Sequence, residues 1–172
     1  MKLSIRETAI FAMLGTIMYL SKMVMEFLPN IHLLAVLTIA YTVVYRQKAL
    51  YPIYVFVFVL GLTNGFNMWW IPHLYLWTVL WGVTMLLPKR MPKVVAPIVY
   101  IIVAGAHGFL YGTLYAPAQA IMFGLDFNGT IAWIIAGLPF DITHGISNMV
   151  VGLLITPIIS VIRLAEKTHI RS

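Results

Sequence analysis

The sequence predicts an all-α membrane protein: one domain, residues 1–172, that forms a bundle of six transmembrane helices with both termini in the cytoplasm. Three observations support this. Hydrophobic residues make up 62% of the 172 residues, charged residues make up 9%, and the mean hydropathy is +0.95. A soluble domain carries about 25% charged residues, so this chain has too few charges to cover a surface in water. The other two observations are the spacing of the apolar segments and the placement of lysine and arginine.

Proline, glycine, asparagine and basic residues divide the chain into apolar segments, and crossing a bilayer takes about 20 residues. The six predicted spans are 8–28, 31–45, 49–66, 70–87, 94–114 and 139–163. The first begins like a signal peptide, but Lys22 and Glu26 interrupt it and no A-x-A-like cleavage site follows. We therefore interpret it as a retained first span.

Basic residues alternate with the predicted spans. Ten of the eleven lysine and arginine residues flank the spans on one side: Lys2, Arg6, Arg46, Lys48, Lys89, Arg90, Lys93, Arg163, Lys167 and Arg171. The opposite loops, 29–30, 64–69 and 115–138, contain none. Because cytoplasmic loops are enriched in Lys and Arg, both termini are expected in the cytoplasm. The net charge of +6 then reflects topology and contact with anionic membrane lipid, and it requires no nucleic-acid partner.

The motifs of common enzyme classes are missing. Cysteine is absent, which excludes disulfides, thiolate metal sites and thiol catalysis. The sequence has no Walker A motif, no G-x-S-x-G and no H-E-x-x-H. Its five histidines and five acids show no metal-ligand spacing. We therefore expect no catalytic activity, no cofactor and no metal site.

Asp141, His144 and Asn148 are polar residues within the sixth predicted span. Their i, i+3, i+7 spacing keeps them within about 60° of one another on one helix face. Charged residues inside a membrane usually face a cavity or each other, so these three are candidates for the wall of a ligand pocket. The alternatives are a helix cap for Asp141 and inter-helix hydrogen bonds for the other two.

Other polar and aromatic residues are expected at a similar depth, in the outer half of the membrane. Lys22 and Glu26 share one face of the first span, as pocket residues or as a simple interfacial ion pair. His107 lies near the outer end of the fifth span. The segment "NGFNMWWIPHLYLWTVLW" adds further candidate ligand-binding residues, which could instead form an aromatic belt or pack helices: Asn67, Trp70, Tyr75 and Trp77.

The inner half of the first span has a different character. Thr8, Ala12 and Thr16 are small residues at a spacing of four, with Ala9 beside them. Small residues in this pattern let two helices approach closely. The face is thus a candidate docking site for a partner helix, or a packing face within the chain itself.

These features together resemble the S components of energy-coupling factor (ECF) transporters, small six-helix proteins of prokaryotes that bind vitamins and other micronutrients. The resemblance covers the whole chain and rests on several segments: "TAIFAMLGT", "LPNIHLLAV", "YRQKALYPIYVFV", "WWIPHLYLWTVLWGVTMLLPKRMPK", "HGFLYGTLYAPAQAIMFGL" and "AGLPFDITHGISNMVVGLL". The docking motif of the family's first helix is A-x-x-x-A. Here the match is partial, Thr8-x-x-x-Ala12-x-x-x-Thr16.

The resemblance implies a transport function in the prokaryotic cytoplasmic membrane. Such multi-pass proteins capture a vitamin-like molecule from outside and release it inside, using a transmembrane coupling subunit and two ATPase subunits of the ECF module. Their ligand contacts lie in the outer helix halves and in the loop after the first helix, which adds His32. The loop 115–138 is then a lid or an ordinary connector.

Two other functional classes remain open at this stage. One is a membrane-embedded enzyme that uses His144 and Asp141. The other is a structural membrane subunit without a ligand. Within the transport class, the sequence does not choose among vitamins, nucleobase-like precursors and amino acids.

Overall fold

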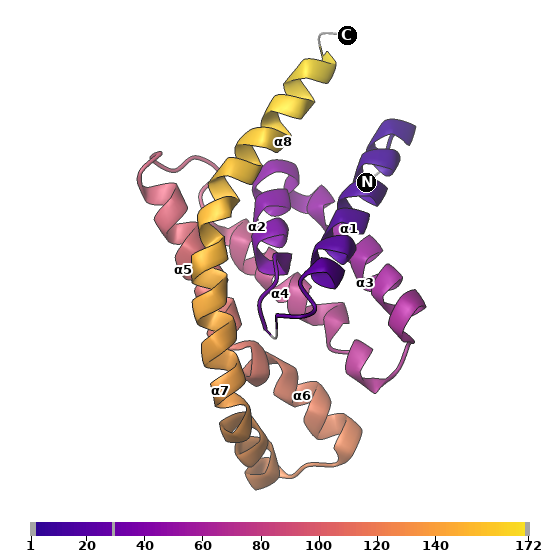
Figure 1. Cartoon of the computed structure of the whole chain (residues 1–172), viewed down its shortest axis with the longest axis vertical. Helices are drawn as coiled ribbons and strands as arrows, with labels where there is room; N and C mark the ends of the chain where they lie inside the picture. Colours follow the sequence, from indigo (N-terminus) through magenta and orange to yellow (C-terminus); the bar gives the residue numbers. More distant parts are fainter. Residues whose placement is uncertain (1–2, 29, 171–172) are drawn as a thin grey trace.

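The computed structural model describes residues 3–28 and 30–170, which form helices and connectors without a β-strand. Lys2 and Arg171 lie outside the described residues. The α-helices of the described part are α1 (Ile5–Val24), α2 (Leu34–Tyr45), α3 (Leu50–Asn64), α4 (His73–Leu86), α5 (Val95–Phe109), α6 (Tyr111–Phe123), α7 (Phe127–Val151) and α8 (Ile155–Ile170) (Figure 1). Short 3-10 turns are η1 (Arg46–Ala49), η2 (Met68–Trp70) and η3 (Gly152–Leu154). The predicted all-α class is confirmed.

Four helical stretches are long and apolar enough to cross a membrane: Ile5–Val24, Leu34–Asn64, Val95–Phe123 and Phe127–Lys167. At most 33% of the most apolar window of each is buried inside the protein. The apolar surface that stays exposed is far larger than that of a soluble monomer. This surface is therefore expected to contact membrane lipid. The second stretch contains both α2 and α3, and Arg46, with a φ of 54°, turns the chain between them.

The prediction that residues 115–138 form a loop is wrong, because most of this segment is helical. Its first part belongs to α6, and α7 begins at Phe127 rather than near Pro139. Both Pro117 and Pro139 lie inside helices, which membrane helices tolerate better than soluble ones. The actual connection is short: Gly124, with a φ of 64°, ends α6, and Asp126 caps α7 by accepting a hydrogen bond from the backbone N–H of Gly129. The result is a helical hairpin and no long lid loop.

Helix α2 lies at the centre of the bundle (Figure 1). The nine consecutive residues from Leu34 to Thr42 are all buried. A helix that is apolar on every side is expected to be surrounded on every side, and α2 contacts α1, α4, α5, α7 and α8. The central position agrees with a second predicted span that is short and contains no lysine, arginine, aspartate or glutamate.

Glycines set the distance between α7 and the α5–α6 pair. A Cβ atom built on Gly108 would lie 2.8 Å from the Cα of Gly145, and one built on Gly145 would lie 2.3 Å from the ring of Phe109. A Cβ on Gly112 would lie 2.6 Å from a carboxylate oxygen of Asp141. These contacts leave no room for a side chain. The backbones of α5 and α7 therefore meet directly at Gly108 and Gly145, in the manner of small-residue seams in membranes.

The basic residues gather at one end of the molecule, where α1 begins and α8 ends, opposite the α6–α7 hairpin (Figure 1). Lys48 forms an ion pair with Glu7, and the Tyr45 hydroxyl donates a hydrogen bond of 3.0 Å to Glu166. Arg46 donates to the carbonyl of Met85 at the end of α4. Segments that the sequence placed on one side of the membrane are thus neighbours in space.

Candidate ligand-binding site

Six ring side chains meet between α4, α5, α6, α7 and the connector that follows α1. We call them the ring cluster: His32, His73, Trp77, His107, Tyr111 and His144. The ring centroid of His144 lies 4.7 Å from that of His32 and 4.8 Å from that of Tyr111. The Trp77 ring lies 5.6 Å from His107. Trp77, His107 and His144 are each no more than 5% exposed, whereas His32, His73 and Tyr111 are partly exposed.

The sequence analysis selected four of these six residues, and the structure brings them together. His32, Trp77, His107 and His144 come from four different segments of the chain. It did not select His73 or Tyr111. The signal for both was present, because His73 precedes Trp77 by four residues and Tyr111 follows His107 by four, which places each pair on one helix face.

Backbone hydrogen bonds fix the tautomers of two imidazoles. His107 Nε2 lies 3.2 Å from the carbonyl oxygen of Leu76, and His73 Nδ1 lies 3.2 Å from that of Trp69. A carbonyl can only accept, so in each neutral ring this nitrogen carries the hydrogen. The other nitrogen, Nδ1 of His107 and Nε2 of His73, is then a hydrogen-bond acceptor.

Several buried polar atoms in and beside the cluster have no hydrogen-bond partner among the described residues. They are His32 Nδ1, Trp77 Nε1, His107 Nδ1, His144 Nε2 and Asn148 Oδ1. Buried polar atoms are nearly always paired, and leaving one unpaired costs about 1–3 kcal/mol. The five atoms lie in and beside one cluster of rings.

The connector after α1 carries His32 into the cluster. It is tied down by Ser147, whose hydroxyl donates a hydrogen bond of 2.8 Å to the carbonyl oxygen of Asn30. Asn30 adopts a φ of 60°, a conformation that asparagine accepts more easily than most residues. His32 lies outside the helices, and burial lowers its pKa to about 4, so its ring is neutral at pH 7.

Asp141 does not cap its own helix, so that interpretation is wrong. It lies in the second half of α7, and its carboxylate accepts the backbone N–H of Gly112 with both oxygens, at 2.9 and 3.1 Å. Gly112 is in the first turn of α6, where backbone N–H groups lack partners and negative charge is favourable. Asp141 therefore stabilises the start of a neighbouring helix.

Asn148 has two roles available. Its Nδ2 donates a hydrogen bond of 3.1 Å to the carbonyl of Ala104 on α5, so the expected helix–helix contact is present. Its Oδ1 remains among the unpartnered atoms. The amide is therefore fixed in orientation by α5, and its acceptor oxygen stays free.

Lys22 and Glu26 form the expected i,i+4 ion pair, with a nitrogen–oxygen distance of 3.6 Å. The Lys22 side chain is 25% exposed and that of Glu26 is 62% exposed. Burial is the main cause of the lowered pKa of His32, and the charge of Lys22 contributes to it. Glu26 faces away from the protein interior.

Three other candidates lie outside the ring cluster. Trp70 donates its Nε1–H to the carbonyl of Val57 at 2.8 Å, and its ring packs against Phe66. Tyr75 donates its hydroxyl to the carbonyl of Leu114 at 2.8 Å. Asn67 is exposed just before η2. Trp70 and Tyr75 join helices to one another, and the structure gives no sign that the three residues meet one ligand.

The small-residue face of α1 is open. Thr8, Ala9, Ala12 and Thr16 are all exposed, whereas Gly15, beside them on the helix, packs against α3. These four residues are therefore not covered by the described part of the chain. The hydroxyls of Thr8 and Thr16 donate to the carbonyls of Ser4 and Ala12 in their own helix. The face consequently presents small, apolar groups, and its threonine hydroxyls need no hydrogen-bond partner from another helix.

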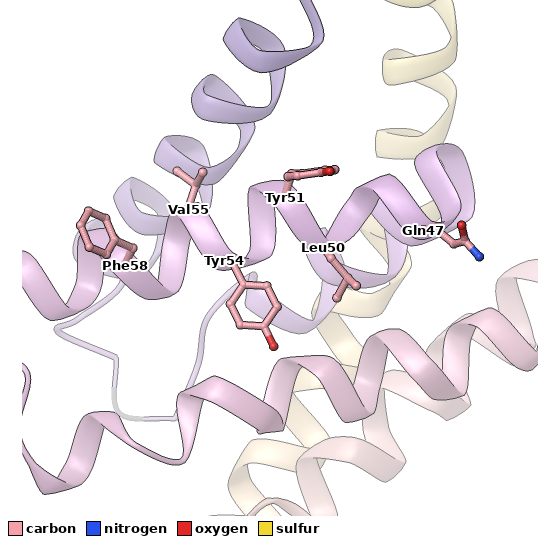
Figure 2. A pocket seen from close by; sticks show the side chains of 6 residues that line it. All are labelled: Gln47, Leu50, Tyr51, Tyr54, Val55 and Phe58. Carbon is pink, nitrogen blue, oxygen red and sulfur yellow. The ribbon is translucent and has the colours of Figure 1, made fainter. Parts of the chain in front are cut away.

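An apolar hollow of about 620 Å³ lies on the surface of the protein along α3 (Figure 2). Its lining is Gln47, Leu50, Tyr51, Tyr54, Val55 and Phe58. The Tyr54 hydroxyl is bonded to α4 through the carbonyl of Leu74. None of these residues belongs to the ring cluster, and the apolar lining is that of a surface which faces lipid.

No group of three or more histidine, aspartate or glutamate residues in the described part of the chain is placed to hold a metal ion. No family model, curated protein or solved structure matches the chain. The functional interpretation therefore depends on the residues and their geometry.

Proposed function

We propose that this chain is the substrate-binding subunit of an ECF-type importer, which captures a vitamin-like molecule outside the cell for release inside. The observation that supports it most is the group of unpartnered buried polar atoms around Trp77, His107 and His144. Aromatic rings with a few convergent polar groups are typical of the side chains that line small-molecule sites.

The polar atoms also describe the ligand. His107 Nδ1, His73 Nε2 and Asn148 Oδ1 are acceptors, while Trp77 Nε1 is a donor. Neutral imidazoles and aromatic faces favour a planar ring that carries its own N–H or O–H donors and at least one acceptor. Lys22, whose charge acts on His32, would meet an anionic substituent. A ring-bearing vitamin or nucleobase-like precursor fits this set better than an aliphatic amino acid.

The proposed partner, a transmembrane coupling subunit with two ATPases, would dock on the exposed face of α1. This face lies near the basic end of the molecule, away from the ring cluster, so binding and docking would use separate surfaces. With the basic end in the cytoplasm, the ring cluster would open outward. The partial motif Thr8-x-x-x-Ala12-x-x-x-Thr16 supplies the close approach that such docking requires.

The enzyme alternative receives less support from the geometry. A His144–Asp141 relay would need the carboxylate to orient the imidazole, but both carboxylate oxygens of Asp141 accept the N–H of Gly112. A structural subunit without a ligand would leave the five unpartnered atoms unexplained.

Affinity purification of the tagged chain from its own membranes tests the proposal. The wild-type chain should retain a transmembrane coupling subunit and two ATPases, identified by mass spectrometry. Ala12→Trp should lose them, because an indole on the small-residue face holds the partner helix away. Ile146→Trp is the matched control, since Ile146 is 53% exposed on α7, away from this face. Recovery of no ATPase with the wild-type chain would contradict the proposal.

A further inference from the structure

A second polar feature lies at the basic end of the molecule, away from the ring cluster. It is a pocket of about 620 Å³ between the connector of residues 87–94, α5 and α8. Four cationic side chains line it: Lys89, Arg90, Lys93 and Arg163. We call it the basic pocket.

The basic pocket has no acidic side chain in its lining. The chain has five acids, all of them among the described residues. Each is engaged elsewhere, in an ion pair, a helix cap or an inter-helix hydrogen bond: Glu7, Glu26, Asp126, Asp141 and Glu166. Four like charges around one hollow repel each other, and an anion bound between them would reduce that repulsion.

The rest of the lining indicates what kind of anion. Ala96 and Pro97 on α5 and Ile159 on α8 provide an apolar wall beside the cations. Both helices belong to stretches that can cross a membrane, so this wall continues into the lipid-facing surface. Arginine binds phosphate oxygens in a two-pronged fashion that suits this chemistry.

We propose that the basic pocket binds the phosphate group of an anionic phospholipid, with the cations on the headgroup and an acyl chain along the apolar wall. A soluble phosphate compound offers the same headgroup chemistry but no acyl chain. The apolar wall is what favours the lipid.

The test counts bound lipid by native mass spectrometry. Detergent-purified protein is titrated with phosphatidylglycerol, with phosphatidylcholine, or with glycerol phosphate as the water-soluble headgroup. Arg90→Gln/Arg163→Gln removes two pocket cations. The control Arg6→Gln/Lys167→Gln removes the same charge at the same end of the molecule without touching the pocket lining. A cation close to anionic lipid contributes about five-fold to binding, so the pocket variant should bind phosphatidylglycerol about 25-fold more weakly.

The expected result is one tightly bound phosphatidylglycerol, lost in the pocket variant and kept in the control. Equal weakening in both double variants would overturn the proposal, because it would mean diffuse surface charge. If glycerol phosphate binds as tightly as phosphatidylglycerol, the acyl chain contributes nothing. The pocket would then be a site for a soluble phosphate compound, and the proposal of a lipid would be wrong. If the double variant does not fold, Lys93→Gln against Lys167→Gln repeats the comparison with one charge each and an expected five-fold difference.

Discussion

Replacing His144 by leucine should raise the stability of the ligand-free protein and lower its affinity for ligand. His144 is 3% exposed and its Nε2 has no partner among the described residues. Leucine has a similar volume and no polar atom to leave unpaired. An unpaired buried polar group costs about 1–3 kcal/mol, so unfolding should become harder by at least about 1 kcal/mol. For a domain of this size, that raises the melting temperature by about 2–4 °C.

The same substitution removes one hydrogen bond to the ligand. Such a bond contributes about 0.5–1.5 kcal/mol, which corresponds to a loss of affinity of about 2- to 13-fold. Melting followed by tryptophan fluorescence and binding measured by calorimetry give the two numbers. Ile146→Leu, on the exposed side of the same helix, is the control and should change neither.

Two results would refute this reasoning. A melting temperature that falls in His144→Leu would show that Nε2 is already satisfied within the protein. An affinity within two-fold of wild type would mean that His144 only packs helices. Opposite changes in stability and affinity are the signature of a residue kept for its ligand.

Three further predictions follow from other parts of the molecule. Reporter fusions at the C-terminus and in the short turn at Gly124 should read opposite sides of the membrane, and the same side for both would exclude the proposed topology. Gly112→Ala should destabilise the protein by about 1–3 kcal/mol, because its Cβ would lie 2.6 Å from Asp141. Gly137→Ala, which meets nothing within 4 Å, should not destabilise it, and an equal loss in both would refute the seam. Ala12→Trp should abolish uptake in vesicles that contain the whole complex but preserve ligand binding by the isolated subunit; loss of binding as well would contradict separate surfaces for docking and binding.

Sequence reasoning captured what depends on local pattern. The i, i+3, i+7 spacing placed Asp141, His144 and Asn148 on one helix face, and all three are buried on α7. The alternation of basic residues predicted which connections lie together, and those of them that the structure describes gather at one end. Each of these follows from the helix period or from charge, which a single sequence displays.

The failures depend on contacts across the fold. Pro117 and Pro139 seemed to mark a loop, because proline breaks helices in water, yet both lie inside helices here. Asp141 finds its partner in the backbone of Gly112, 29 residues earlier in the chain. The partner of Trp70 is likewise a backbone carbonyl, that of Val57 on α3. A backbone N–H or carbonyl carries no residue-specific signal, so the sequence cannot indicate which helix will offer one.

The most direct test of the central claim is to identify what the purified protein carries. Protein from cells grown in rich medium is denatured, and the released small molecules are identified and quantified by mass spectrometry. We expect one ring-bearing molecule with N–H or O–H donors, near one per chain, strongly reduced in His144→Leu and unchanged in Ile146→Leu. Release of lipid and detergent alone from the wild-type protein, under conditions where added vitamins and nucleobases also fail to bind, would contradict a ligand-binding role for the ring cluster.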